Sequence, residues 1–221
     1  MARFFDGTNG TRISLADNPA VNFGTGDFSL AFWIRTSQNP PGGTFPVPIH
    51  HEDESSSPRS GYGFFIDDTL NVLEFNVLSG GTEAISIGRD ISDGNWHFIV
   101  GVKTATKIYL YIDGILENST SHTLGSTDKA VAFEVGDKSN TANRELIGYI
   151  DEVTLWSKAL SNEEVKSLFN RRLPWDNFLR LYWRLDEESG TSANDLTGRG
   201  LTGTHNGGVS HAPNAPITYG G

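Results

Sequence analysis

A strand that runs directly into a short, well-specified helix is the feature of this sequence that most constrains its fold. It lies in residues 148–169, GYIDEVTLWSKALSNEEVKSLF. Ser161 is a favourable N-cap, and Glu164 three positions later completes a capping box. The apolar residues that follow recur at i, i+3 and i+4: Val165, Leu168 and Phe169. The sequence therefore predicts one short α-helix near residues 161–170, with a single apolar stripe that docks onto a sheet.

Almost all of the remaining chain has the pattern of strands and turns. Apolar and polar residues alternate, as in strands with one buried face, over residues 28–35, 62–66, 73–77, 97–103 and 107–113. In the first of these, Phe32 and Ile34 face one way, and Trp33 and Arg35 face the other. Turn signals such as NPPGG and SDGN separate the segments. Closely spaced strands of this kind predict an all-β fold, an antiparallel β-sandwich.

The alternation slips by one residue within 150–153, so we predict a β-bulge near Asp151. Residues 179–188 read as a further strand, and residues 190–221 as closing turns and edge strands. The chain contains no linker and no long internal repeat. We therefore predict one domain over residues 1–221.

Composition excludes several kinds of site and partner. The chain has no cysteine, which excludes disulfides, thiolate zinc sites and cysteine nucleophiles. With 17 Lys and Arg against 27 Asp and Glu, its net charge is −10, whereas nucleic acids and anionic membranes select clustered basic surfaces. No apolar run is long enough for a membrane span, and no signal peptide is evident. We expect no nucleic-acid partner and no membrane insertion.

Four segments, in order, resemble the laminin-G-like and pentraxin-like branch of the concanavalin A-like lectin/glucanase superfamily. They are FDGTNGTRISL at 5–15, FSLAFWIRTS at 28–37, DGNWHFIVGVKTATKIYLYIDG at 93–114 and LIGYIDEVTLWSKALSNEEV at 146–165. The resemblance implies a jelly roll of two stacked antiparallel sheets, and an extracellular or cell-surface location. Because this fold carries lectins, adhesive modules and glucanases, the function must be inferred from the site.

The resemblance also implies a structural calcium ion where the opening strand meets the IDEV strand. Asp6 and Asp151 lie in the matching motifs, and Ca²⁺ takes about six to eight oxygen ligands, many of them carboxylates. In the alternative, Asp6 begins a turn and Asp151 is a solvated residue at the bulge. Calcium is thus the one cofactor that the sequence predicts.

A second candidate site is the acidic loop 50–61, HHEDESSSPRSG, facing residues 136–145, GDKSNTANRE. In pentraxins the loops at these two places hold calcium and, through it, ligand. The candidate ligand-binding residues in the two loops are His51, Glu52, Asp53, Asp137 and Asn140. Lys138 and Arg144 depart from the pentraxin pattern and argue against a phosphate-binding site with two calcium ions. The alternative is a pair of solvated loops that bind nothing.

A third candidate is an aromatic platform for sugar rings. Tyr109 and Tyr111 share the strand face opposite an apolar stripe, so both are expected to point outward, where a pyranose could stack on them. Tyr62 flanks the variable loops and is a further candidate. The alternative is that the outward tyrosines pack beneath the helix and loops. The tryptophans in predicted strands are assigned to packing, and Trp175, in a loop, is the one expected to be exposed.

No catalytic constellation is evident. Retaining glucanases place carboxylates about 5–5.5 Å apart across a cleft, and no predicted strand carries alternate carboxylates. Asp151 and Glu152 are adjacent, so we expect them on opposite faces. The sequence therefore predicts a non-catalytic carbohydrate-binding module or lectin that binds a glycan or glycoconjugate. In one form of this prediction, a calcium ion assists glycan binding. The alternatives are a protein–protein adhesion module, for which a homo-oligomer is one form, and a glycoside hydrolase or lyase with an unrecognised site.

Overall fold

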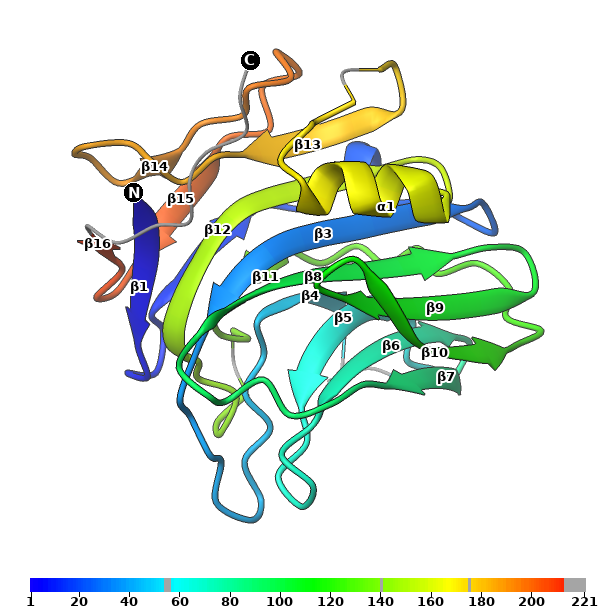
Figure 1. The fold of residues 1–221 in the computed structure, drawn as a ribbon, viewed down its shortest axis with the longest axis horizontal. Helices are drawn as coiled ribbons and strands as arrows, with labels where there is room; N and C mark the ends of the chain where they lie inside the picture. The colour runs from blue at the N-terminus through cyan, green and yellow to red at the C-terminus, as the bar shows by residue number, and fades with distance from the viewer. Residues whose placement is uncertain (54–56, 140, 175, 213–221) are drawn as a thin grey trace.

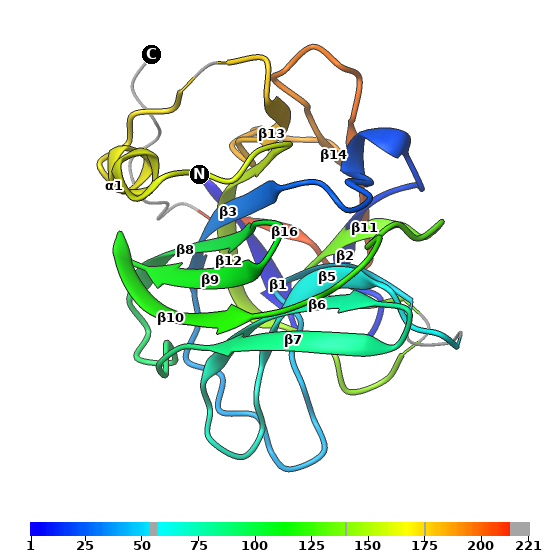
Figure 2. The same cartoon turned by 90° about the vertical axis from the view of Figure 1, so that its right-hand side faces the viewer.

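The chain folds into two stacked antiparallel β-sheets with one α-helix on the outside, as the computed structural model shows (Figure 1, Figure 2). The structure describes residues 1–53, 57–139, 141–174 and 176–212. This architecture confirms the predicted all-β sandwich of the concanavalin A-like jelly-roll type. No helix in these ranges has the length and apolarity needed to cross a bilayer.

The first sheet, sheet A, has the strand order β10-β9-β8-β3-β12-β1-β16, with β13 paired to β12. Its strands are β1 (Ala2–Asp6), β3 (Phe28–Arg35), β8 (Trp96–Lys103), β9 (Lys107–Ile112), β10 (Ile115–Ser121), β12 (Ile147–Trp156), β13 (Leu179–Trp183) and β16 (Ser210–Ala212). Because β12 pairs with β1, β3 and β13, it connects the opening, the middle and the closing parts of the chain.

The second sheet, sheet B, has the order β14-β15-β2-β11-β4-β5-β6-β7. Its strands are β2 (Arg12–Leu15), β4 (Ile49–Glu52), β5 (Gly61–Ile66), β6 (Leu73–Ser79), β7 (Thr82–Ile87), β11 (Phe133–Val135), β14 (Ser192–Ala193) and β15 (Gly203–Asn206). A short 3-10 helix, η1 (Pro19–Val21), follows β2. The sequence did not predict β4, which takes up the start of the expected loop 50–61.

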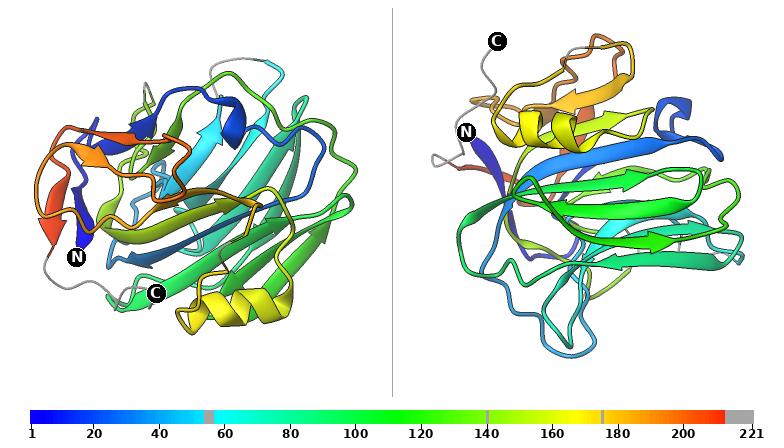
Figure 3. Two further views of the ribbon diagram at one scale, coloured as in Figure 1. Left: turned by 90° about the horizontal axis from the view of Figure 1, so that it is seen from above. Right: turned by 45° about the vertical axis from the view of Figure 1, so that its right-hand side comes forward.

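The main core lies between the two sheets and is rich in phenylalanine. Phe32 of β3 meets Phe64 of β5 edge-on at 5.0 Å between ring centroids, and Phe64 stacks on Phe75 of β6 at 4.9 Å. A second, smaller core lies on the outer face of sheet A, where α1 (Asn162–Phe169) covers it (Figure 3). Aromatic side chains of this size dominate the hydrophobic free energy of folding.

The predicted helix start is confirmed. Ser161 Oγ accepts a hydrogen bond from Glu164 N, and the Glu164 carboxylate accepts one from Ser161 N at 2.8 Å. Val165 and Leu168 are buried in the second core, and Phe169 stacks on Trp33 of β3 at 5.9 Å. The helix therefore closes the outer face of sheet A, as its apolar stripe predicts.

The predicted bulge is also confirmed. Asp151 pairs with Trp33 and Thr154 with Ala31, so two residues of β12 oppose one of β3. Ile150 and Val153, on either side, both lie in the core between the sheets. The two residues between them therefore both turn away from that core, which corrects the expectation that Asp151 and Glu152 lie on opposite faces. Glu152 has a φ of 54°, a left-handed conformation that the bulge imposes.

The closing part of the chain adds short strands to the edges of both sheets. β16 pairs with β1, and β15 pairs with β2. This confirms the prediction of edge strands as far as Ala212. The strand expected over 179–188 is shorter than predicted, because β13 ends at Trp183 and Leu185 has a positive φ of 59°.

The capping box yields a test of this helix. We expect Ser161→Ala to lower the free energy of unfolding by about 1 kcal/mol, because Glu164 N loses its acceptor. Ser167→Ala, the same change inside α1, serves as the matched control. It is expected to cost less, since it removes only a long, exposed hydrogen bond to Arg172 O at 3.4 Å and Ala favours a helix. Urea unfolding measures both variants. Equal stability of Ser161→Ala and the wild type would show that the box does not contribute.

Candidate functional site

The two predicted loops begin at neighbouring strands in the middle of sheet B, β4 and β11. β11 pairs with β4, with Glu134 opposite His50. Further along, Phe45 N donates to Asn143 O and Val47 N donates to Arg144 O, each at 2.9 Å. These contacts involve residues 45–47, which precede the loop 50–61. Within that loop, His50 is the residue that the described contacts bring near the second loop: its Nε2 lies 3.0 Å from Glu134 Oε2, which also accepts from Ser139 N at 2.9 Å. That the two whole loops face each other stays a prediction. Asn140 lies outside the described residues, as do Glu54 and Trp175.

The acidic groups of these loops are engaged by the protein itself. Glu52 is 2% exposed, and its Oε1 accepts from Arg59 Nε at 2.9 Å. Asp137 is buried, and its oxygens accept from Gly10 N at 2.7 Å and Lys138 N at 2.6 Å. These contacts correct the expectation of open, solvated ligand donors: both side chains stabilise the loops and do not face solvent.

His51 and Asp53 are also held within the protein. His51 is completely buried, its Nε2 lies 3.1 Å from Asn22 Oδ1, and burial lowers its pKa to about 4. Asp53 is half-buried, with a carboxylate oxygen 3.7 Å from Lys129 Nζ. Among the described members of this set, Asp53 alone is not fully buried.

The three predicted tyrosines mostly serve packing. Tyr62 is completely buried, and its hydroxyl donates to Val21 O at 2.8 Å. Tyr111 is buried in the second core with α1, and Tyr109 is half-buried against the same core. This corrects the expectation that Tyr62 and Tyr111 are outward ligand contacts. The alternative, tyrosines packed beneath the helix, describes Tyr111 and in part Tyr109.

The register of β1 against β12 separates the predicted calcium ligands. Asp6 lies opposite Ile147, whereas Arg3 lies opposite Ile150, next to Asp151. Four strand positions separate Ile147 from Asp151, which is roughly 13 Å at about 3.3 Å per residue. Two carboxylates at that separation do not coordinate one ion directly, since Ca–O distances are about 2.3–2.6 Å. Asp6 and Asp151 therefore do not fit a shared calcium ion.

Asp151 nevertheless has an unusual environment. It is completely buried, and neither carboxylate oxygen has a well-formed hydrogen bond among the described residues. Burial and the neighbouring Glu152 raise its pKa to about 9, and the N-terminal ammonium group and the Glu152 backbone amide compensate only in part. A buried carboxyl of this kind is either protonated or paired with a cation. No cluster of three or more His, Asp or Glu residues suited to a metal occurs in the part of the chain that is described.

The outer face of sheet A carries a row of half-buried side chains that crosses four strands. Trp96 of β8 lies opposite Arg35 of β3, Arg35 opposite Tyr149 of β12, and Tyr149 opposite Phe4 of β1. All four are half-buried, and we call them the outer row. Their strand neighbours point into the core between the sheets: Phe5, Ile34 and Ile150. The outer row therefore faces away from that core.

The members of the outer row touch one another and border a hollow. Phe4 and Tyr149 have ring centroids 4.9 Å apart, and Trp96 lies 6.2 Å from Tyr149. The guanidinium carbon of Arg35 lies 5.3 Å from the centre of the Tyr149 ring, a cation–π distance. Phe4, Arg35 and Tyr149 line a hollow of about 240 Å³, together with Ile147, which is 48% exposed. This is a shallow surface with two aromatic rings and one cation.

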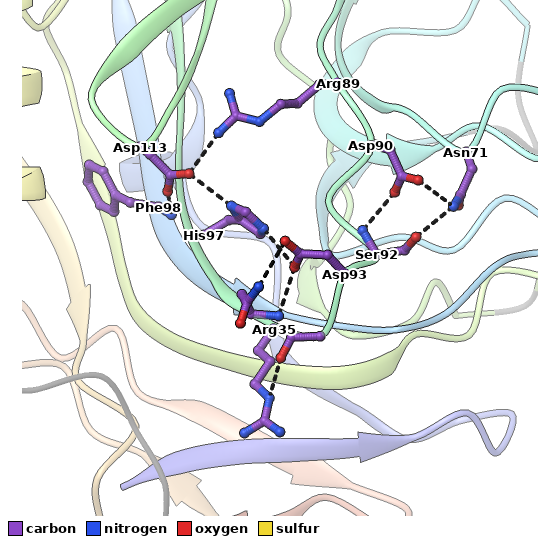
Figure 4. A network of polar contacts seen from close by, with 11 residues as sticks. Arg35, Asn71, Arg89, Asp90, Ser92, Asp93, His97, Phe98 and Asp113 are labelled. Atoms are coloured by element: carbon purple, nitrogen blue, oxygen red, sulfur yellow. Dashed lines mark hydrogen bonds and ion pairs between the residues drawn. The ribbon is translucent and has the colours of Figure 1, made fainter.

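A polar network holds the turn beside this hollow (Figure 4). Arg35 Nε donates to Gly94 O at 2.9 Å, so the turn fixes the guanidinium of Arg35. Asp93 Oδ1 in turn accepts from Asn95 N at 2.8 Å and from His97 Nε2 at 3.1 Å. The turn that contains Gly94 is thereby closed on itself and tied to β8.

His97 links this turn to the β9–β10 hairpin. Its Nδ1 donates to Asp113 Oδ2 at 2.9 Å, and Asp113 also accepts from Arg89 Nη2 at 2.7 Å and from Phe98 N at 2.8 Å. The imidazole therefore lies between two carboxylates (Figure 4), and their hydrogen bonds raise the pKa of His97. As an imidazolium ion, His97 donates from both ring nitrogens and stabilises the turn that positions Arg35.

The sequence predicted the outward direction of Arg35 but did not predict which residues form the outer row. Alternation placed Arg35 outward, and Trp96 was assigned to packing. Neither Phe4 nor Tyr149 was identified, because each is a single aromatic residue beside a core residue. The missing signal is the register between strands, which decides that residues 4, 35, 96 and 149 lie in one line.

Comparison with known proteins agrees with this architecture. The profile of the concanavalin A-like lectin/glucanases superfamily matches residues 6–166. Over 155 residues, 63% of this chain, the sequence is 29% identical to the sushi, von Willebrand factor type A, EGF and pentraxin domain-containing protein 1 of Rattus norvegicus. The match spans 4% of that protein's length.

Solved structures of low identity share the fold. A protein from Bacteroides ovatus, provisionally described as carbohydrate-binding, superposes with a TM-score of 0.73 at 17% identity, covering 100% of this chain and 62% of that one. The binding domain of Paraclostridial Mosquitocidal Protein 1 gives 0.63 at 21% identity, covering 76% and 42%. The heptameric SAP-like pentraxin of Limulus polyphemus gives 0.62 at 9% identity, covering 92% and 94%. At these identities the likeness shows the fold alone.

The position of His97 predicts a pH-dependent contribution to stability. Because its folded pKa is raised above 6.5, the stabilisation is fully present below about pH 6.5 and is lost as pH rises through the folded value. We expect His97→Gln to lose more unfolding free energy relative to wild type near about pH 6 than near about pH 9. His122→Gln is the control, since the pKa of His122 is lowered. Denaturant titrations at both values measure this, and equal deficits at the two pH values would contradict it.

The buried Asp151 predicts a gain of stability on substitution. In the unfolded chain this carboxyl group has its ordinary pKa of 3.8 and is ionised at neutral pH, whereas in the folded chain it must stay protonated. The cost of folding is up to about 4 kcal/mol at about pH 7 and vanishes toward about pH 4. We expect Asp151→Asn to be more stable than wild type at neutral pH and to lose that advantage in acid.

The same two proteins, wild type and Asp151→Asn, also test whether a structural calcium ion binds at Asp151. If Ca²⁺ binds at Asp151, adding it raises the melting temperature of the wild type and leaves Asp151→Asn unchanged. Asp6→Asn is the matched control, because Asp6 is exposed and lies far from Asp151 along the sheet. A wild-type melt that calcium does not shift removes a structural ion from this position.

Proposed function

Since this chain belongs to the concanavalin A-like lectin/glucanases superfamily, we propose that it is a non-catalytic carbohydrate-binding module whose ligand site is the outer row. The observation that carries the proposal is the cross-strand alignment of four half-buried residues on the outer face of sheet A: Trp96, Arg35, Tyr149 and Phe4. Sugar rings bind aromatic side chains through their C–H faces, while hydroxyls bond to nearby polar groups. The Bacteroides ovatus neighbour supports the ligand class.

The residues that line the hollow support recognition over a chemical step. Glycosidases flank the scissile bond with two carboxyl groups in a cleft. Among the described residues that line the hollow there is no carboxylate. Glu52, one of the carboxylates of the acidic loop, is buried and paired with Arg59 on the other sheet. We therefore assign binding without catalysis, and place the protein outside the cell or at its surface with the laminin-G-like domains it resembles.

Substitution in the outer row tests the proposal. We expect Tyr149→Ala to weaken glycan binding about tenfold or more, roughly 1.4 kcal/mol, because the stacking surface is lost. Phe178→Ala is the matched control: Phe178 is 51% exposed and precedes β13, which pairs with the opposite end of β12. A glycan array followed by calorimetry, each with calcium and with chelator, measures binding.

The outcomes separate the possibilities clearly. Equal loss in both variants would indicate a nonspecific effect, and undiminished binding by a folded Tyr149→Ala would place the site elsewhere. Complete silence across neutral, acidic and sulfated glycans would overturn carbohydrate binding itself. Loss of binding only with chelator would support a calcium-assisted version of the module.

A protein–protein adhesion module is the second candidate. It is favoured by exposed apolar residues on β10, the edge strand of sheet A, where Ile115 is 63% and Leu116 is 47% exposed. Exposed apolar side chains of this kind can form a contact surface for a partner or a second copy. Light scattering distinguishes this candidate, since a stable homo-oligomer that Leu116→Lys dissociates would support it.

A further inference from the structure

We infer that the outer row recognises a carboxylated pyranose, a uronic or sialic acid residue, with its carboxylate on Arg35 and its ring against Tyr149. This inference rests on the proposed function and specifies the ligand class of the same site. It follows from the free end of the Arg35 guanidinium, from the charge of the hollow and from its size.

The guanidinium of Arg35 is held through its Nε atom, and its two Nη atoms remain for a ligand. Its Nε donates to Gly94 O at 2.9 Å. The two Nη atoms have no hydrogen-bond partner in the part of the chain that the structure describes. Two parallel N–H groups on one planar end match the two oxygens of a carboxylate, and the paired contact is stronger than a single neutral hydrogen bond. The turn thus prepares Arg35 for a planar anion before any ligand arrives.

The hollow has a positive charge although the chain is acidic. Of the described residues that line it, Arg35 is the only charged one. The nearest acidic group of the turn, Asp93, is committed to His97 and to Asn95. The net charge of the protein is −10, but no carboxylate among the described residues of this hollow neutralises Arg35. Arg35 can therefore attract an anionic group of a ligand.

The aromatic rings and the size of the hollow indicate a sugar as the carrier of that carboxylate. Arg35 Cζ lies 5.3 Å from the centre of the Tyr149 ring, so a carboxylate on Nη places its attached ring beside Tyr149 and Phe4. The volume, about 240 Å³, is below the roughly 300–1,000 Å³ of pockets for larger ligands, which fits one pyranose. Ser37, exposed at the rim, adds a hydroxyl for sugar hydroxyls.

Calorimetry on the wild-type protein gives the first test and needs no variant. Oligosaccharides that end in glucuronate or in sialic acid are compared with their methyl esters, which keep the ring and remove the charge. We expect at least tenfold weaker binding of the ester, and weaker binding of the acid at high salt. Which acid binds more tightly identifies the source of the carboxylate. Equal affinity of acid and ester overturns the inference and leaves carbohydrate binding intact.

Variants give the second test. Arg35→Lys keeps the charge and removes the paired contact, so it should lose most of the preference for acid over ester while still binding the ester. Tyr149→Ala should weaken acid and ester alike. A retained preference in folded Arg35→Lys overturns the assignment to Arg35. Tighter binding of a sulfated sugar than of either carboxylated one overturns the carboxylate assignment, and failure of every sugar to bind overturns the proposed function as well.

Discussion

The bulge in β12 is the constraint on which the rest of this structure depends. Before it, Ile150 faces the core between the sheets and Tyr149 faces outward; after it, Val153 and Leu155 face the same core. Without the extra residue, one half of the strand would turn its apolar side chains to the wrong face. The bulge therefore lets one strand complete the sandwich core at both ends. It also leaves Asp151 and Glu152 buried on the outer side, where their charges are costly.

Features that depend on neighbours in sequence could be predicted, and this explains which parts of the fold were correct. The Ser161 cap, the alternation in residues 28–35 and the phase slip near Asp151 are all local, and the structure has each of them. The short strand β4 was missed, because IHHE carries three polar residues and is buried on both faces. Its burial comes from β11, β5 and the loops that cover them, none of which is local to it.

The candidate site depends on contacts between distant segments, so the sequence identified the wrong residues for it. Carboxylates in a loop suggest ligand donors, yet Glu52 and Asp137 have partners at Arg59, Gly10 and Lys138 that no spacing rule reveals. Conversely, Phe4 and Tyr149 become one surface only because β1 and β12 pair in a particular register. Residue type indicated the chemistry of binding, whereas pairing between strands decided its location.

The pairing of the closing strands bears on how this protein should be trimmed for study. The superfamily match ends at residue 166, but β13, β15 and β16 all follow that position and pair with β12, β2 and β1. A fragment cut at the end of the match would leave three strands with open backbone donors and acceptors, a template for self-association. Without β16, β1 would be the edge strand of sheet A, and Phe4 would lie on that unpaired edge. Expression boundaries should therefore extend at least through Ala212.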